Sequence, residues 1–240
     1  MCKNNYVDIG WNVSNCVKVL FTTRNFFSQK DFNISYLNDD YKKIFLNRKK
    51  LVETILPNNP NFIKQIHGNK VINLDKKNIN PYTADGLITT KKNNVISVLT
   101  ADCMPIVISS VCGSIICILH VGRKGLMYNI IEKAIKILAT YNYTYEAWIG
   151  PSVSKNYYQV DKNIREKFIS IDNNYQKFFF GLNNNKFNMD IKGIACFQLN
   201  SNNIRNIYSS EYCTVTHNDL FYSYRKSKDI QRFGTFVWIS

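Results

Sequence analysis

Residues 100–125 run TADCMPIVISSVCGSIICILHVGRKG, two apolar and β-branched runs on either side of the tripeptide CGS at 112–114. This pattern predicts two adjacent strands joined by a tight connection. Hairpin pairing brings the start of the first strand near the end of the second, so Cys103 and His120 are expected to meet in space. A thiol and an imidazole at the open end of one hairpin suit either a metal site or a nucleophile–base pair.

The rest of the chain mixes strand and helix patterns. Strands are predicted at residues 17–23, 87–90, 95–99, 146–150, 212–216 and 234–240, with two short ones around His67 within 61–74. Apolar spacing predicts helices at 41–55, from just after Gly125 to 138 and at 190–199, and one or two helical turns are expected at 162–169. Residues 173–188 are expected to form a surface excursion. Regular strand–helix alternation is absent, which favours an α+β fold of packed mixed β-sheets flanked by helices, in a single layered domain of residues 1–240.

Composition limits the class of protein. The chain has 240 residues, of which 45% are hydrophobic, enough for one sizeable core. No apolar run of about 18 residues predicts a membrane span, and the N-terminus lacks the apolar region of a signal peptide. Seven scattered cysteines are better explained as small buried side chains than as disulfide partners. A cytoplasmic protein without a membrane partner is therefore expected.

The formal net charge is +14, from 31 basic and 17 acidic residues. A basic face that binds nucleic acid is one explanation. Compositional drift is the other, because Lys, Asn, Ile, Tyr and Phe are all abundant and all have A/T-rich codons. The lysines occur in small scattered groups rather than one stripe, which favours drift. No specific nucleic-acid partner is expected, and the sequence leaves the oligomeric state open.

Three residues suggest a metal site: His67, Cys103 and His120. Two imidazoles and one thiolate suit Zn²⁺, and three protein ligands leave a fourth position for water, as in catalytic zinc sites. In a cysteine hydrolase, by contrast, Cys103 would be the nucleophile and His120 its base, with Asp102 beside them. A blue-copper site with Met104 is disfavoured, because neighbours on a strand point to opposite faces. A multicopper site needs far more imidazoles than the three histidines present.

Six motifs in order resemble the laccase-domain family of YfiH type, over nearly the whole chain. They are QIHG at 65–68, ADGLIT at 84–89, TADCMP at 100–105, HVGRKG at 120–125, IGPSV at 149–153 and FYSYRK at 221–226. The resemblance implies an α+β fold related to cysteine-dependent deamidase toxins. It also implies phosphorolysis of the purine nucleosides adenosine, inosine, guanosine and methylthioadenosine, adenosine deamination at the same site, and zinc held by His67, Cys103 and His120. A bacterial branch linked to peptidoglycan-precursor editing leaves a hydrolase as the alternative.

Other residues are candidates for substrate contacts. Arg24 and Arg225 are expected to hold phosphate. Gln65 is expected to hydrogen-bond the base or the ribose. Asp102 or Asp85 is the candidate proton carrier, and capping of a turn is an equally good explanation for each carboxylate.

The chain departs from the family pattern in two loops. The family's FSTRxGG becomes FTTRNFF at residues 21–27, which removes both glycines and keeps Arg24. In the HAGWRG motif, Arg123 replaces the tryptophan and Lys124 the arginine, so a weaker bidentate phosphate contact is expected. Ser152 stands where many members have cysteine. None of these replacements touches the three predicted metal ligands.

Overall fold

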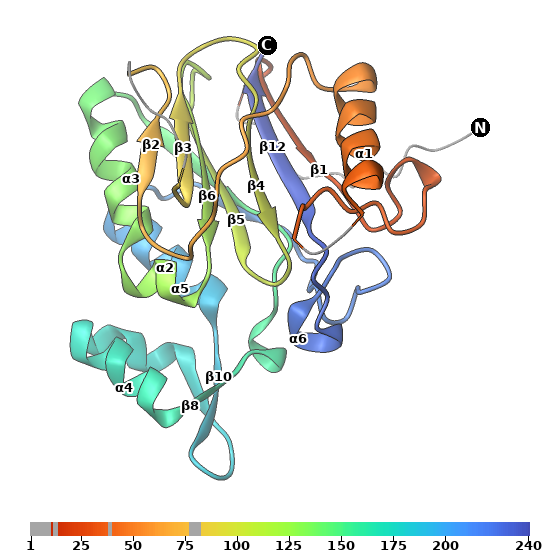
Figure 1. The fold of residues 1–240 in the computed structure, drawn as a ribbon. Coiled ribbons are helices and arrows are strands. Elements are labelled where there is room, and N and C mark those ends of the chain that lie inside the picture. The colour runs from red at the N-terminus through yellow and green to blue at the C-terminus, as the bar shows by residue number, and fades with distance from the viewer. Residues whose placement is uncertain (1–10, 12–13, 38–39, 77–82) are drawn as a thin grey trace.

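Among the described residues, the largest of three β-sheets has six strands in the order β11-β7-β5-β6-β3-β2 (Figure 1). Its strands are β2 (Val71–Asn73), β3 (Gly86–Thr89), β5 (Met104–Ser110), β6 (Ile116–Val121), β7 (Tyr145–Ile149) and β11 (Ile207–Ser209). β5 and β6 pair antiparallel, with Pro105 opposite His120, so the predicted hairpin is confirmed. This computed structural model describes residues 11, 14–37, 40–76 and 83–240.

Side chains on β5 and β6 alternate between the two faces of the central sheet. Ile106 and Ile108 belong to the core on the helical side, whereas Val107 and Ile118 belong to the core on the side of a second sheet. Every residue of both strands is buried, as expected for strands covered on both faces. Because every second residue shares a face, His120 points the same way as Ile118.

Helices cover one face of the central sheet (Figure 1). They are α2 (Arg123–Met127), α3 (Ile130–Leu138) and α5 (Ile191–Ser201), with the short helix η2 (Ala139–Tyr141) after α3. The sequence predicted one helix after Gly125, but the structure has two, and the first begins at Arg123. Asn129 lies between them with φ 56°, a left-handed conformation that interrupts a helix.

The second sheet, in the order β1-β12-β4, packs on the other face of the central sheet. It contains β1 (Val17–Phe21), β4 (Ile96–Thr100) and β12 (Phe233–Ile239). Its outer face packs against α1 (Tyr41–Thr54). The fold therefore has four layers: the helices α2, α3 and α5, the central sheet, the second sheet and α1 (Figure 1). The Asp40 side chain caps α1 by accepting from two backbone amides. The preceding Asn38 and Asp39, like the N-terminal residues 1–10, lie outside the described residues.

A third, smaller sheet corrects one prediction. Its strands are β8 (Gln159–Asp161), β9 (Phe179–Gly181) and β10 (Lys186–Met189). The helices next to them in the chain are η3 (Lys155–Tyr157), α4 (Lys162–Ile171) and η4 (Asn173–Phe178). Residues 173–188 are therefore not a mere surface excursion. Tyr175 and Phe179 are buried in the main core, so these two aromatic residues serve packing.

Two other strand predictions were also wrong. Residues 212–216 form turns, and only Cys213 makes an isolated bridge, to Ser152. Cys213 and Val215 are buried, so the apolar character of this segment reflects packing rather than strand pairing. Before β2, only isolated bridges at Asn61 and Lys64 replace the predicted first strand.

The remaining described elements are η1 (Phe26–Ser28) and α6 (Tyr224–Ser227). Several packed sheets flanked by helices confirm the predicted α+β class. Within the described residues, no helix is both long and apolar enough to cross a bilayer.

Replacement of Ile118 by alanine is expected to lower the free energy of unfolding by about 2–5 kcal/mol, because it leaves a cavity between the two large sheets. Ile118 is fully buried. Urea denaturation followed by circular dichroism measures the change. Val111→Ala is the control, because Val111 is 44% exposed and its loss should cost little. Equal losses in the two variants would contradict this layer assignment.

Candidate metal centre

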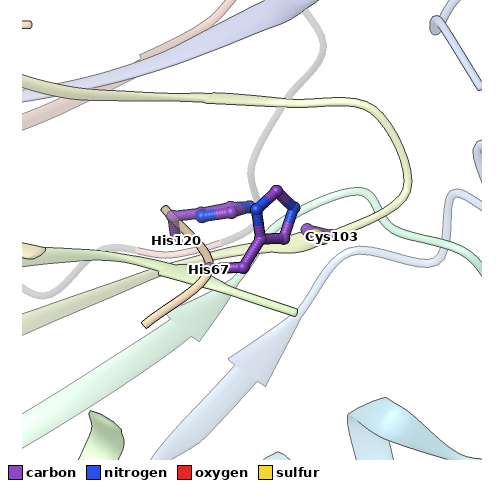
Figure 2. A group of neighbouring side chains, drawn as sticks. All are labelled: His67, Cys103 and His120. Carbon is purple, nitrogen blue, oxygen red and sulfur yellow. The ribbon is translucent and has the colours of Figure 1, made fainter. Parts of the chain in front are cut away.

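His67, Cys103 and His120 converge at one edge of the central sheet (Figure 2). His67 lies in the loop before β2, Cys103 directly before β5, and His120 near the end of β6. One ligand atom from each residue lies within 4.8 Å of the others. The two imidazole rings meet edge to face, with centroids 4.7 Å apart. The structure thus brings together the three residues that the sequence predicted as ligands.

Asp85 organises two of these ligands. Its carboxylate is fully buried and accepts hydrogen bonds from the backbone amides of His67 (2.9 Å) and Gly68 (2.7 Å), with a longer one from Ile66 (3.3 Å). Asp85 Oδ1 also lies 2.8 Å from His120 Nδ1. This contact holds the ring so that Nε2 is free to bind a metal. Burial would raise the pKa of Asp85, but the contact with His120 and the backbone donors lower it.

The Asp102 carboxylate, next to Cys103 in the chain, is hydrogen-bonded by residues of the C-terminal segment. Its Oδ1 accepts from the hydroxyls of Thr214 (2.6 Å) and Ser223 (2.7 Å), and its Oδ2 from the backbone amide of Arg225 (2.6 Å). The residue has φ 88°, and His67 has φ 57°, so both flank the centre in left-handed conformations. The Asp102 carboxylate therefore ties the Cys103 turn to the C-terminal segment.

Gly122 allows the backbone to pass close to the Cys103 thiol. A Cβ atom at this position would lie 2.7 Å from Cys103 Sγ and 3.5 Å from His67 Cδ2. Any other residue would therefore crowd the thiol. The donor set of one sulfur and two imidazole nitrogens fits a single metal ion of intermediate softness.

The thiol and one imidazole share a proton-transfer equilibrium. Burial would raise the pKa of Cys103, but His120 and His67 beside it lower the pKa to about 6. Burial would lower the pKa of His120, but Cys103 and Asp85 raise it to about 9. Without a metal, a thiolate and an imidazolium therefore stand side by side near neutral pH.

Two cavities meet at the centre, and both are lined by His67, Ala101, Cys103 and Arg232. The first, of about 460 Å³, is the basic cavity, and its other lining residues are Asp102, Arg123, Lys124, Tyr158, Tyr224 and Arg225. The second, of about 560 Å³, is the aromatic cavity, and its other lining residues are Ser35, Tyr36, Leu37, Arg48, Phe62, Ile63, Lys64, Gln65, Leu99, Thr100 and His120. Both volumes are typical of small-molecule sites.

The predicted substrate residues are divided between these cavities and the scaffold. Arg225 lines the basic cavity, and one of its terminal nitrogens donates to the Gln159 carbonyl. Gln65 lines the aromatic cavity, but its side-chain amide pairs with both backbone groups of Leu99. Arg24 lines neither cavity, and its guanidinium donates to Asp229 at 2.7 Å.

Sequence reasoning missed several lining residues. They are Tyr36, Arg48, Phe62, Tyr158 and Arg232. Arg48 lies on α1 among several other basic residues, so no local pattern distinguishes it from its neighbours. Arg232 follows the last recognised motif, and its guanidinium donates to two backbone carbonyls, of Asp229 and Gln231.

The fold and this centre place the chain among mixed α+β proteins that can hold one metal ion at a sheet edge open to two cavities. A family model described as multi-copper polyphenol oxidoreductase laccase matches residues 18–240, so the chain belongs to that family, as its motifs predicted. The remaining histidine, His217, is not part of the centre, and its Nδ1 lies beside the hydroxyl of Thr216. Two imidazoles and one thiolate could hold one ion and are too few ligands for a multicopper cluster.

Relatives with assigned names cover most of the chain. A purine nucleoside phosphorylase of Haemophilus influenzae is 29% identical over 240 residues, which span 97% of this chain and 98% of that protein. A purine nucleoside phosphorylase of Campylobacter jejuni is 31% identical and covers 74% of this chain and 76% of its own length. The crystal structure of Neisseria meningitidis protein NMB0706 superposes with a TM-score of 0.88, at 23% identity, over 98% of this chain and 99% of that one.

Replacement of Asp85 by asparagine is expected to weaken metal binding by about 10- to 100-fold, because an amide cannot accept from every donor around it. Competition with a chromophoric chelator for Co²⁺ measures the affinity. Asp75→Asn is the matched control, since Asp75 accepts from Thr89 and Thr90 on the same sheet, outside the centre. Equal losses of affinity in the two variants would contradict the role of Asp85.

Metal binding near pH 7 is expected to release about one proton, because His120 is protonated below its pKa of about 9 and must lose that proton to bind. Affinity should therefore fall about tenfold per pH unit as pH decreases below 9, and more steeply below the Cys103 pKa of about 6. Calorimetric titration with Zn²⁺ in buffers of different ionisation enthalpy counts the protons. A pH-independent affinity across this range would contradict the thiolate–imidazolium pair.

Proposed function

We propose that the chain is a zinc-dependent purine nucleoside phosphorylase. Its substrates would be inorganic phosphate and nucleosides of the adenosine, inosine, guanosine and methylthioadenosine group. The observation that carries the proposal is the junction of two unlike cavities at His67 and Cys103. An anion and a flat base can approach one reaction point from two sides there. The names of the relatives from H. influenzae and C. jejuni support the same reaction.

The basic cavity suits phosphate. Arg123, Lys124, Arg225 and Arg232 line it, and its only carboxylate among the described residues, Asp102, already accepts three hydrogen bonds. Cations fixed beside a bound phosphate also stabilise the negative charge that is redistributed in the transition state. A phosphate oxygen forms the bond to ribose C1′, the C1′–N9 bond breaks, and its electron pair leaves with the purine, which takes up a proton.

The aromatic cavity suits the nucleoside. Phe62 and Ile63 provide apolar wall, which a base needs for contact area. Thr100 lines the same cavity, and its buried hydroxyl has no hydrogen-bond partner among the described residues. A buried polar group left unpaired is costly, so a bound polar ligand that pairs with it gains affinity.

His67, Cys103 and His120 would hold zinc in this proposal. A bound zinc ion acts as a Lewis acid and lowers the pKa of water next to it. Asp85 fixes the His120 ring and the His67 backbone, and Asp102 fixes the turn that carries Cys103. The protein's contribution is thus a rigid donor set with open space beside it.

Adenosine deamination is the second activity that we infer from the family. It adds water at purine C6 and releases ammonia, so it needs C6 at the centre. Phosphorolysis needs ribose C1′ there instead. One nucleoside must therefore enter the aromatic cavity in two different orientations to undergo both reactions.

A cysteine hydrolase is the second candidate, including one that acts on peptidoglycan precursors. The observation in its favour is the low pKa of Cys103, about 6, beside His120, with Asp85 orienting that ring. Nucleophile, base and orienting carboxylate stand in the order that covalent catalysis requires. The two candidates differ in their need for metal.

Purified, zinc-loaded protein is expected to release purine base from nucleosides only when phosphate is present, and a chelator should abolish the activity until Zn²⁺ is restored. Chromatography of base and ribose 1-phosphate measures the reaction. Arg225→Gln should raise KM for phosphate about tenfold or more, since it removes a charge-assisted contact. Arg205→Gln is the control, because Arg205 is exposed and lines neither cavity. Absence of base release from every nucleoside would overturn the proposal.

A further inference from the structure

Arg48 is held in one orientation at the wall of the aromatic cavity. Its guanidinium lies 4.2 Å from the centroid of the Tyr36 ring and 3.6 Å from that of Phe62. Its Nε donates to the Ile34 carbonyl at 2.8 Å. Two aromatic contacts and one hydrogen bond remove most of the freedom of this long side chain.

The two terminal nitrogens of Arg48 remain for a ligand. Among the described residues, no group accepts a hydrogen bond from either of them. Burial lowers the pKa of Arg48 to about 10, which leaves the side chain charged near neutral pH. The guanidinium therefore presents a fixed, charged pair of donors.

The aromatic cavity offers mainly hydrogen-bond donors. Three cations line it, Arg48, Lys64 and Arg232, and the hydroxyls of Ser35 and Thr100 can donate. No Asp or Glu occurs among the described residues that line it. The amide oxygen of Gln65 already accepts from the Leu99 backbone. A ligand edge rich in acceptors fits this wall better than an amino group does, because the three cations can only donate and the hydroxyls can do either.

Purines differ at the edge that such a wall would meet. A 6-oxopurine presents two acceptors, O6 and N7, which an arginine fork matches with two hydrogen bonds. A 6-aminopurine presents N7 but replaces O6 by an N6 amino donor, which arginine cannot satisfy because it has no acceptor. Glutamine matches that edge instead, because its amide both donates and accepts.

We propose that Arg48 holds the O6–N7 edge of the base, so that this chain prefers 6-oxopurine nucleosides, inosine and guanosine, over adenosine. The proposal rests on the proposed phosphorylase function and names its substrate class. With O6 and N7 at Arg48, N9 and the ribose are free to face His67 and Cys103, and phosphate approaches C1′ from the basic cavity.

The test compares kcat/KM for phosphate-dependent base release from inosine and from adenosine, with hypoxanthine and adenine separated by chromatography. The wild-type protein is expected to prefer inosine at least tenfold. Arg48→Gln should bring this preference to parity or reverse it, an effect that loss of packing alone would not produce. Arg48→Lys should weaken the preference while it keeps the charge. Arg165→Gln is the matched control, since Arg165 also stacks on a phenylalanine ring, Phe187, and lines neither cavity.

Failure of this inference is distinguishable from failure of the proposed function. Base release with equal efficiency from both nucleosides would overturn the role of Arg48 and leave the phosphorylase standing. An Arg48→Gln protein with a native melting temperature and an undiminished inosine preference would also overturn it. If no nucleoside releases base, calorimetry with hypoxanthine and adenine decides. At least tenfold tighter binding of hypoxanthine that is lost in Arg48→Gln supports the proposal, and equal binding overturns it.

Discussion

One buried carboxylate, that of Asp85, connects the fold to the centre. A charge removed from water is costly unless donors surround it, and here three backbone amides and the His120 ring do so. The sheet order explains why these donors are available. β3 lies between β2 and β6, parallel to the first and antiparallel to the second, so the start of β3, the start of β2 and the end of β6 share one edge. Cys103 reaches that edge because β5 is antiparallel to β6.

Much of this arrangement follows from the local sequence, and some of it does not. The alternation in residues 100–125 predicts the hairpin and therefore the meeting of Cys103 with His120. The role of Asp85 depends on strand order, which no local pattern reveals, so the sequence left capping and proton transfer as equal choices. The prediction of a surface excursion at residues 173–188 was wrong for a similar reason. Asparagine suggests a surface loop, whereas burial of Tyr175 and Phe179 depends on partners distant in the chain.

The departures from the family pattern have physical consequences. Phe27 stands at a position where the family has glycine, and its backbone keeps φ 57°, a left-handed conformation that glycine adopts more easily. This strain costs about 1–2 kcal/mol. Phe27 packs edge to face against Phe26 and Phe32, with ring centroids 4.7 and 5.6 Å apart, which offsets the cost. Aromatic packing therefore takes the place of glycine's conformational freedom in this loop. Arg24 beside it donates a hydrogen bond to Asp229.

The candidate metal centre lies between two cavities. In the proposed enzyme, the cavity walls and not the metal ligands would therefore determine which reaction occurs. The same three ligands are compatible with attack at ribose C1′ or at purine C6, because a donor set does not select which atom is placed beside it. In the proposed phosphorylase, the wall of the aromatic cavity would make that selection, since it would determine which end of the nucleoside faces His67 and Cys103. The basic cavity would add a second condition, because Arg225 and Arg232 line it and cations attract an anionic co-substrate. Within this family, substitutions in either wall can therefore change the reaction while the metal ligands stay the same.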